Sequence, residues 1–272
     1  MAEVTGNFLI DDAIRRIEDN YGDLVSVKGK RKALRKFGRN ANVGQTRSDV
    51  QQFAGSETTL TMLSDNLITK VCTDDPDFTG QMKIEGHTID SVGLLTFSSQ
   101  THTLTGNTPV DLDPPLRDAT HIAPASVDNL ASGKKVYVFE NTATTNGVPN
   151  DTSKVHVILD QSYGRSQKAA TSISSTDYWI ITAVYGGLLK KTSAYADIEM
   201  RAGKVGWMQE TLMEIPVYSA GNPYQNLPLS EAIIIPKNSD WVMTASCSTT
   251  GCDVIAGAAG VLAKVIGRTS AS

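Results

Sequence analysis

The stretch KKVYVFENTATTNGVPNDTSKVHVILD, residues 134–160, largely decides which fold the sequence predicts. Apolar residues recur at every second position in its two runs: Val136 and Val138, then Val155, Val157 and Leu159. Alternation of this period is typical of β-strands with one apolar face and one mixed face. The Asn146-Gly147 pair between the runs favours a tight turn inside an exposed loop. The stretch therefore predicts two β-strands joined by a turn-containing loop.

Short strand-like runs separated by turn residues continue on both sides of this stretch. From Glu57 onward, short runs rich in Thr, Val, Ile and Leu alternate with Asp, Gly and Pro, a pattern of antiparallel strands. Residues 161–170 are polar and without period, so they mark the best domain boundary. We predict a mainly β protein with a helical and extended arm over 1–54, a first β domain over 55–165 and a C-terminal β-sandwich over 166–272. Both β modules are expected to be sandwich-like or jelly-roll-like.

The N-terminal arm is predicted to begin with a helix over residues 8–20. Its apolar residues follow helical three-to-four spacing, and Gly22 offers a stop: Ile10, Ala13, Ile14 and Ile17. A second short helix is predicted over Lys30 to Phe37, ended by Gly38. The polar residues from Asn40 to Gly55 sustain no period and are predicted to form an extended connection.

Composition narrows the classes of function. The 272 residues carry a net charge of −4, with 20% charged and 40% hydrophobic residues, so the whole molecule is not built to coat a polyanion. No apolar stretch reaches the roughly 20 residues of a membrane-spanning helix. The first 20 residues carry acids where an export signal would have its apolar run, so no export signal is expected.

The most basic segment is KGKRKALRKFGRNANVGQTR, residues 28–47, which contains no Asp or Glu. It could bind phosphates with a steep salt dependence, dock on an acidic protein surface, or form a solvated helix packed through Leu34 and Phe37. Only Phe37 could stack on a base, so we favour the acidic protein surface. The predicted interaction residues are Lys28, Lys30, Arg31, Lys32, Arg35, Lys36 and Arg39.

A search for catalytic motifs yields none. The sequence has no phosphate-binding loop, no GxSxG elbow and no HExxH motif. The four histidines fall on different predicted strands or loops without a carboxylate partner at motif spacing: His87, His102, His121 and His156. We therefore predict a protein that is not an enzyme and takes no cofactor. A hydrolase with an unrecognised site is the remaining alternative from that class.

Two patterns could indicate a metal site, and a simpler interpretation is preferred for each. DPDFTG, residues 75–80, resembles the first half of a calcium loop, but position twelve would be Gly86 rather than Glu. We predict a solvated strand-to-strand turn there. Cys247 and Cys252 are separated by four residues rather than the two of a zinc knuckle, so with Cys72 they are predicted to be reduced thiols.

The three tryptophans lie in apolar strand contexts of the C-terminal half: Trp179, Trp207 and Trp241. We predict that they are buried in the core. An exposed tryptophan or tyrosine platform would instead indicate glycan binding.

Several segments from Lys36 to Ile266 resemble β modules of virion structural proteins from tailed bacteriophages, particularly marine ones. In the first half these are KFGRN, GQMKIEG, HTLTGNTPVDL and LRDATHIAPAS. In the second half they are SQKAATSISSTDYWIITAVYGG, ADIEMRAG and IIIPKNSDWVMTASCSTTGCDVIAGAAGVLAKV. The sequence departs from the family at SSTDYW, where Pro-Ala-Gly-Lys is frequent. The motifs are short, and they do not indicate a position in the particle.

The resemblance implies a virion component assembled in the cytoplasm of a bacterial host. We expect a head decoration or cement protein whose arm clamps neighbouring capsid subunits. Its expected partners are the major capsid protein and copies of itself in a homotrimer. Nucleic acid and membrane are not expected as partners. The alternatives are a neck or tail component, or an attachment module that binds a host-surface glycan.

Overall fold

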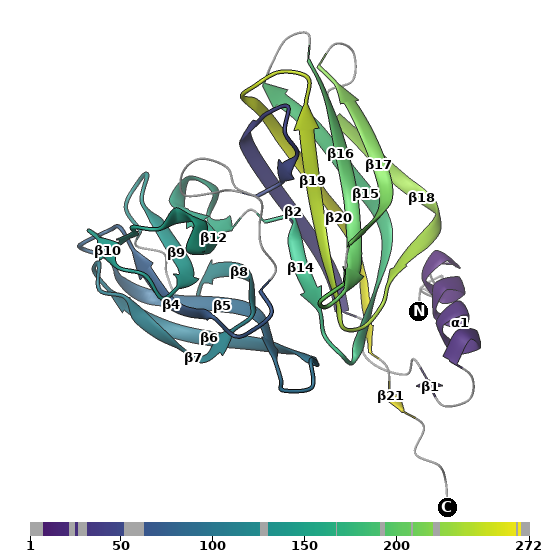
Figure 1. Ribbon diagram of the computed structural model, residues 1–272, viewed down its shortest axis with the longest axis horizontal. Helices are drawn as coiled ribbons and strands as arrows, with labels where there is room; N and C mark the ends of the chain where they lie inside the picture. The colour runs from purple at the N-terminus through teal and green to yellow at the C-terminus, as the bar shows by residue number, and fades with distance from the viewer. Residues whose placement is uncertain are drawn as a thin grey trace, which may run out of the picture.

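The computed structural model describes residues 8–21, 25–26, 32–51, 63–125, 130–166, 168–190, 194–207, 209–219, 224–264 and 266–267. The chain is mainly β, with several antiparallel sheets and one short α-helix near the N-terminus. Figure 1 shows two β units side by side, a smaller one in blue and teal and an elongated one in green and yellow. The predicted mainly β class with sandwich-like modules is confirmed.

The first unit is built from two sheets. Its strands are β4 (Ile68–Thr73), β5 (Thr79–Ile89), β6 (Leu95–Thr105), β7 (Val110–Leu116), β8 (Asp118–Pro124), β9 (Lys135–Glu140), β12 (Val155–Asp160) and β13 (Arg165–Ser166). One sheet has the order β13-β12-β9-β4-β7 and the other β6-β5-β8. Fully buried residues such as Met82, Ile84 and Leu116 fill the space between the sheets.

Strands β9 and β12 form the antiparallel pair that residues 134–160 predict, with Val157 opposite Val138. The mixed face is also buried, because Tyr137 and Ile158 belong to a second apolar cluster on the other side of the sheet. Val155, predicted on the apolar face, belongs to this second cluster, since the register shifts between Val155 and Val157. The predicted turn is confirmed by positive φ angles of 50° at Asn146 and 75° at Gly147. It joins two short strands, β10 (Thr144–Thr145) and β11 (Val148–Pro149). The connection also contains a 3-10 turn at Thr152–Lys154, and another follows β12 at Gln161–Tyr163.

The second unit is a sandwich of two longer sheets. Its strands are β2 (Lys32–Val43), β3 (Ser48–Asp49), β14 (Ala170–Ile173), β15 (Asp177–Lys190), β16 (Tyr195–Lys204), β17 (Glu210–Tyr218), β18 (Tyr224–Ile235), β19 (Ser239–Cys247) and β20 (Cys252–Lys264). One sheet is β18-β15-β20-β2 and the other β14-β19-β16-β17, with β3 added to β19. Trp179 and Trp241 meet edge to face in the core, with ring centroids 4.8 Å apart.

The predicted second helix over Lys30 to Phe37 is wrong, because residues 32–43 form strand β2 along β20. Gly257 permits this close pairing, and Gly38 lets the segment after β3 lie against β2. A Cβ atom at Gly38 would lie 1.8 Å from the Val50 carbonyl oxygen, and one at Gly257 would lie 2.1 Å from the Lys36 carbonyl oxygen. Pairing with a strand more than 200 residues away thus overrides a local helix preference.

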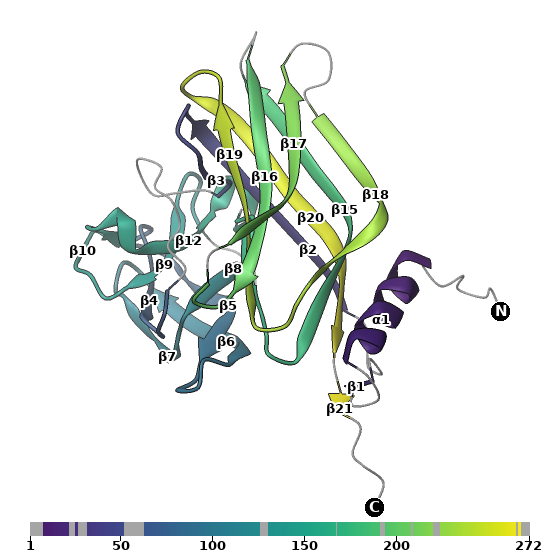
Figure 2. The same ribbon diagram turned by 45° about the vertical axis from the view of Figure 1, so that its right-hand side comes forward.

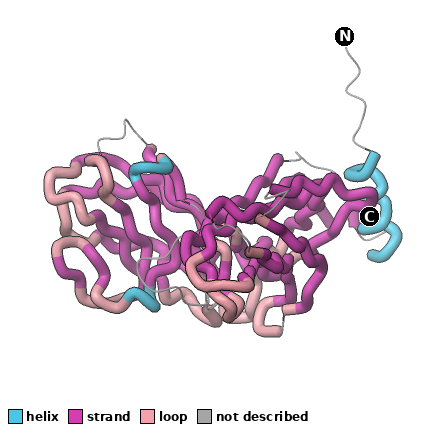
Figure 3. The backbone as a smooth tube through the Cα atoms, turned by 90° about the horizontal axis from the view of Figure 1, so that it is seen from above, coloured by secondary structure: helices cyan, strands magenta, loops and turns pink. Residues whose placement is uncertain are grey.

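The N-terminal helix α1 (Phe8–Tyr21) confirms the prediction for residues 8–20. Its apolar stripe, including Ala13 and Ile17, packs on Tyr178 and Ile180 of β15. Figures 2 and 3 show α1 at the end of the second unit away from the first unit. The described parts of residues 1–54 therefore pack on or within the second unit rather than forming a separate arm. No helix among the described residues is long and apolar enough to cross a membrane.

Strands from the beginning and the end of the described chain pair with one another in and beside the second unit. Strand β1 (Val25–Ser26) pairs with β21 (Ile266–Gly267), and β2 and β3 pair with β20 and β19. The whole first unit lies between β3 and β14 in the sequence. The first unit is thus an insertion in the second unit, which is assembled from two separate stretches of chain.

The prediction of three reduced thiols is wrong for two of the cysteines. Cys247 ends β19 and Cys252 begins β20, and the two form a disulfide with a Cα to Cα distance of 6.5 Å. Because β19 and β20 belong to opposite sheets, the tight connection between them brings the two thiols within bonding reach. Cys72 is a free buried thiol that donates to the Gly147 carbonyl oxygen at 2.8 Å.

Candidate ligand site at the seam between the two β units

The surface where the two units meet, here called the seam, contains a buried ion pair. Arg117, between β7 and β8, donates to both carboxylate oxygens of Asp240 on β19, at 2.6 and 2.7 Å. Ser172 on β14 accepts from Arg117 at 2.9 Å and donates to Asp240 at 2.8 Å. Arg117 is 2% exposed and Asp240 4%. Burial opposes the charge of Arg117, but Asp240 outweighs it and raises the pKa of the guanidinium.

A second buried ion pair lies beside the first. The Lys168 ammonium donates to Asp118 Oδ1 at 3.0 Å and to the Ala119 carbonyl at 2.7 Å. The other oxygen of Asp118 accepts from the Ser172 backbone N–H at 2.9 Å. Burial would raise the pKa of Asp118, but Lys168 and His87 hold it well below its usual value. These two pairs define the paired half of the seam.

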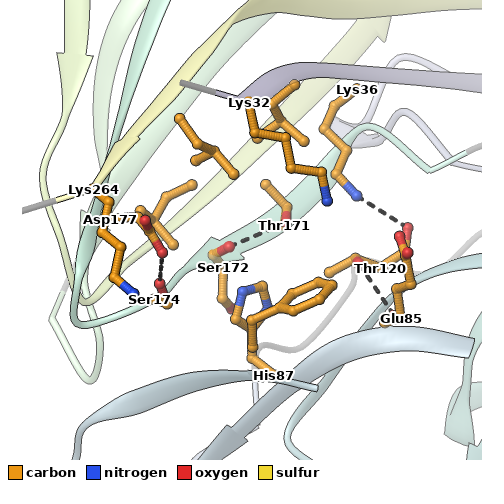
Figure 4. A pocket seen from close by; sticks show the side chains of 14 residues that line it. Lys32, Lys36, Glu85, His87, Thr120, Thr171, Ser172, Ser174, Asp177 and Lys264 are labelled. Carbon is orange, nitrogen blue, oxygen red and sulfur yellow. Dashed lines mark hydrogen bonds between the residues drawn. The ribbon is translucent and has the colours of Figure 1, made fainter. Parts of the chain in front are cut away.

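Beside the paired half, the units leave a cavity of about 260 Å³, here called the seam cleft. Strand β2 and the end of β20 form one wall, β5, β6 and β8 form the opposite wall, and β14 closes the base (Figure 4). The residues that line it are Lys32, Leu34, Lys36, Glu85, His87, Phe97, Thr120, Thr171, Ser172, Ile173, Ser174, Asp177, Leu262 and Lys264.

Three lysines reach the seam cleft without a carboxylate bound to any of them among the described contacts. Lys36 Nζ donates to the Thr120 carbonyl at 3.3 Å. Lys32 Nζ lies 5.4 Å from the centroid of the Phe97 ring. Lys264 extends into the cleft from the end of β20 (Figure 4). Burial lowers the pKa of Lys36 to about 8. These lysines define the unpaired half of the seam.

The two acids of the seam cleft are already engaged. Glu85 accepts from the Lys83 ammonium at 2.6 Å. Burial opposes the ionised form of Glu85, but Lys83 outweighs it and lowers the pKa of the carboxyl. Asp177 accepts a short hydrogen bond from Ser174 (Figure 4). The lysines of the cleft are therefore not neutralised by direct contact with these carboxylates.

His87 is the remaining titratable group of the seam cleft. Its side chain is buried against Phe97, with the ring centroids 5.7 Å apart and the rings close to perpendicular. Its Nδ1 atom lies 3.8 Å from Asp118 Oδ2, too far for a hydrogen bond. No hydrogen-bond partner for Nδ1 occurs in the described part of the chain. The cleft thus holds one unsatisfied buried nitrogen.

The structure divides the predicted interaction residues among different environments. Lys28, Lys30 and Arg31 lie outside the described residues. Lys32 and Lys36, four residues apart on β2, both line the seam cleft. Arg35 is exposed next to it. Arg39 is bound to the buried Asp253 carboxylate on β20, at 2.6 and 2.8 Å.

Sequence reasoning missed most of the seam. Arg117 and Asp240 are separated by 123 residues, and Asp118 and Lys168 by 50. The adjacent charges Arg117 and Asp118 are the local signal that the sequence offers. Motif spacing also failed to reveal a carboxylate partner for a histidine. His156 contacts Glu140 of the neighbouring strand at 2.9 Å.

Two other predicted sites have definite outcomes. Residues 74–78 join β4 to β5 as predicted, but Asp75 is buried and accepts from the backbone N–H groups of Ala131 and Asp77. No cluster of three potential metal ligands occurs among the described residues.

The predicted burial is confirmed for Trp179 and Trp241 and is wrong for Trp207, which is 76% exposed in the turn after β16. Burial removes water from two of the indoles, whereas Trp207 presents its ring to solvent.

Comparisons with known proteins give little beyond these observations. No protein-family model matches the chain, and no curated protein matches it. Among solved structures, it is similar to the infectious bursal disease virus VP2 subviral particle, with 9% identity over 89% of this chain and 73% of that chain and a TM-score of 0.22. The Gx strain of that virus gives 10% identity over 92% and 74%, with a TM-score of 0.20. Values this low carry no functional argument.

Proposed function

We propose that this chain is a structural component of a phage particle, a capsid decoration protein that stabilises the head by bridging capsid subunits. The observation that carries the proposal is the paired half of the seam. Arg117 with Asp240 and Lys168 with Asp118 join the two β units through buried, hydrogen-bonded charges. These charge-assisted hydrogen bonds must break before the units can separate. We infer that the two units move as one body.

A rigid body with two β units suits a protein that braces a shell. Each unit has its own outer surface, so one copy of the protein can contact two neighbouring capsid subunits. The seam would keep the two contacts at a fixed distance from each other. The sequence resemblance over residues 36–266 supports the same class. The basic strand is a poor nucleic-acid surface, since Arg39 is bound to Asp253 and Lys36 is partly buried in the seam cleft. We expect the major capsid protein and further copies of this chain, as a homotrimer, to be the partners.

The test is the copy number in purified particles, measured by quantitative mass spectrometry and normalised to the major capsid protein. A decoration protein should be present at on the order of hundreds of copies, whereas a neck or tail ring holds about six to twelve. Purified protein added to heads that lack it should also raise the temperature at which the heads release DNA. A ring-like copy number, or heads that neither bind the protein nor gain stability, would rule out the decoration role.

A second candidate, an attachment module for a host-surface glycan, is favoured by one observation. Trp207 is 76% exposed beside a recess of about 350 Å³, which is lined by residues including Lys204, Glu210 and Leu212. A solvent-facing indole next to charged hydrogen-bonding groups is suited to stacking on a sugar ring. This recess lies at the turn between β16 and β17, on the second unit.

A glycan array with the full chain tests this candidate. Binding should be lost in Trp207→Ala and kept in Tyr218→Ala, a matched removal of an exposed aromatic on β17. Equal binding by both variants would exclude the Trp207 recess as the glycan site.

A further inference from the structure

The unpaired half of the seam carries an inference beyond the proposed virion role. We propose that the seam cleft binds a small organic anion, with a phosphate or carboxylate group held by the lysines and a compact apolar body against the wall. The inference rests on the cleft alone and stands whether or not the chain belongs to a particle.

The charge balance inside the cleft is the first argument. Three lysines line it, Lys32, Lys36 and Lys264, and only two carboxylates do so. Glu85 is bound by Lys83 from outside the cleft, and Asp177 is bound by Ser174. An incoming anion would therefore meet cations that are not already held by those carboxylates. Coulomb attraction of this kind is stronger in a partly desolvated cleft than at an open surface.

The second argument is the supply of hydrogen-bond donors. An ammonium group has three N–H donors, and Lys36 directs one of them to the Thr120 carbonyl at 3.3 Å. Phosphate and carboxylate oxygens are acceptors that the remaining N–H groups of Lys36 can use.

The size and the apolar wall define the rest of the ligand. Leu34, Phe97, Ile173 and Leu262 line the cleft between the charged groups. Its volume of about 260 Å³ equals that of roughly nine water molecules at about 30 Å³ each. A molecule of the size of phenyl phosphate fits this space, with the ring on the apolar wall and the phosphate on the lysines. A nucleic-acid duplex is far too large for it.

The environment of Lys36 predicts how binding depends on pH. The pKa of Lys36 is lowered to about 8, mainly by burial. The charged groups that act on it from the surrounding strands are Asp118, Lys168, Glu85 and Lys32. Above pH 8 the ammonium loses its proton and with it the attraction for an anion. Affinity should therefore fall as the pH rises from 7 to 9.5, and should fall less in a variant that lacks Lys36.

The experiment is isothermal titration calorimetry of the full chain at pH 7 with phenyl phosphate, inorganic phosphate and benzoate, and with neutral benzyl alcohol. Phenyl phosphate should bind, and benzyl alcohol should not. Lys36→Met should weaken binding about tenfold to a hundredfold, as expected for a lost charge-assisted hydrogen bond, without lowering the thermal unfolding midpoint. Lys264→Gln should weaken binding several-fold. Lys154→Gln, at a lysine of the 3-10 turn before β12 and outside the cleft, is the matched control and should bind like the parent.

Three outcomes would overturn the proposal. One is unchanged binding in both Lys36→Met and Lys264→Gln. Another is an equal loss in Lys154→Gln, which would mean that only the overall charge attracts the anion. The third is tighter binding of an acidic peptide than of phenyl phosphate in competition, which would reassign the cleft to a protein partner. Comparison of benzoate with the two phosphates then identifies the preferred acid group.

Discussion

The two halves of the seam differ in whether their buried cations have a carboxylate partner. In the paired half, Arg117 and Lys168 each meet a carboxylate within 3.0 Å. In the unpaired half, the hydrogen bond of Lys36 among the described residues goes to a backbone carbonyl, and a cavity lies beside it. Charges that are fully enclosed must be paired, whereas a charge beside a cavity can be left for a ligand. The paired residues hold the two units together, whereas the lysines of the unpaired half remain available to bind a ligand.

The largest expected effect comes from breaking the paired half. Arg117→Met leaves Asp240 buried without its partner, so we expect a loss of about 3–5 kcal/mol in the free energy of unfolding. Urea denaturation measures it. Lys70→Met, which removes a partner of the exposed Asp111, is the matched control and should cost less than about 1 kcal/mol. Similar costs for both variants would show that the seam pair is no stronger than a surface pair.

A double variant sharpens this test. Arg117→Met with Asp240→Leu removes both charges, so no unpaired ion remains in the seam. The loss should then be smaller than in Arg117→Met alone. A loss equal to the sum of the two single losses would mean that the charges act independently.

The next largest effect should appear at acid pH. The folded pKa of Asp118 lies well below its unfolded value, so the unfolded chain binds more protons as the pH falls below about 4. The stability that Asp118 contributes is present above that pH and is lost below it. Unfolding of the parent and of Asp118→Asn, followed by circular dichroism from pH 6 to pH 2, should show a steeper acid loss in the parent. Parallel curves would contradict the assignment.

Removing the disulfide should lower stability by a smaller amount and leave ligand binding at the seam unchanged. β19 carries Asp240 near its start and Cys247 at its end, so the disulfide and the seam lie at opposite ends of one strand. The variant with Cys247→Ala and Cys252→Ala loses a short closed loop and should lose about 2 kcal/mol of stability. Its affinity for phenyl phosphate should equal that of the parent. Titration with a thiol reagent under denaturing conditions should detect one free thiol in the parent and would contradict the disulfide if it found three.

The smallest effect should come from the unpaired half and have the opposite sign. Lys36→Met removes a partly buried charge without removing a carboxylate partner, so it should stabilise the fold by on the order of 1 kcal/mol at pH 7. The folded pKa of about 8 lies below the value near 10.5 of the unfolded chain. Between these values the unfolded parent binds more protons, so the parent gains stability as the pH rises. The gap between variant and parent should therefore narrow from pH 7 to pH 10 in urea titrations.

Local patterns predicted the parts of the fold that local physics controls. The helical spacing of Ala13 and Ile17 predicted α1, and the alternation of Val136 and Val138 predicted β9. The Asn146-Gly147 turn followed from its residue types. Each of these signals lies within a few residues of chain, which is why the sequence could reveal it.

The parts that failed depend on partners far away in the sequence. β2 has a helix-like composition, and only its pairing with β20 makes it a strand. The seam joins residues that are 50 and 123 positions apart, and no spacing rule links them. The basic segment did contribute two residues to the candidate site, Lys32 and Lys36. Their charge was visible in the sequence, but the cleft that they face was not.

The insertion of the first unit between β3 and β14 determines the order in which the protein can be made. During synthesis β2 leaves the ribosome early, and its partner β20 follows only after the whole of the first unit. The first unit can therefore fold while the second still waits for its last strand. Until then β2 is an unpaired edge open to other chains. Slow translation through residues 63–166 should thus lower the yield of soluble protein, because it lengthens the time during which β2 has no partner strand.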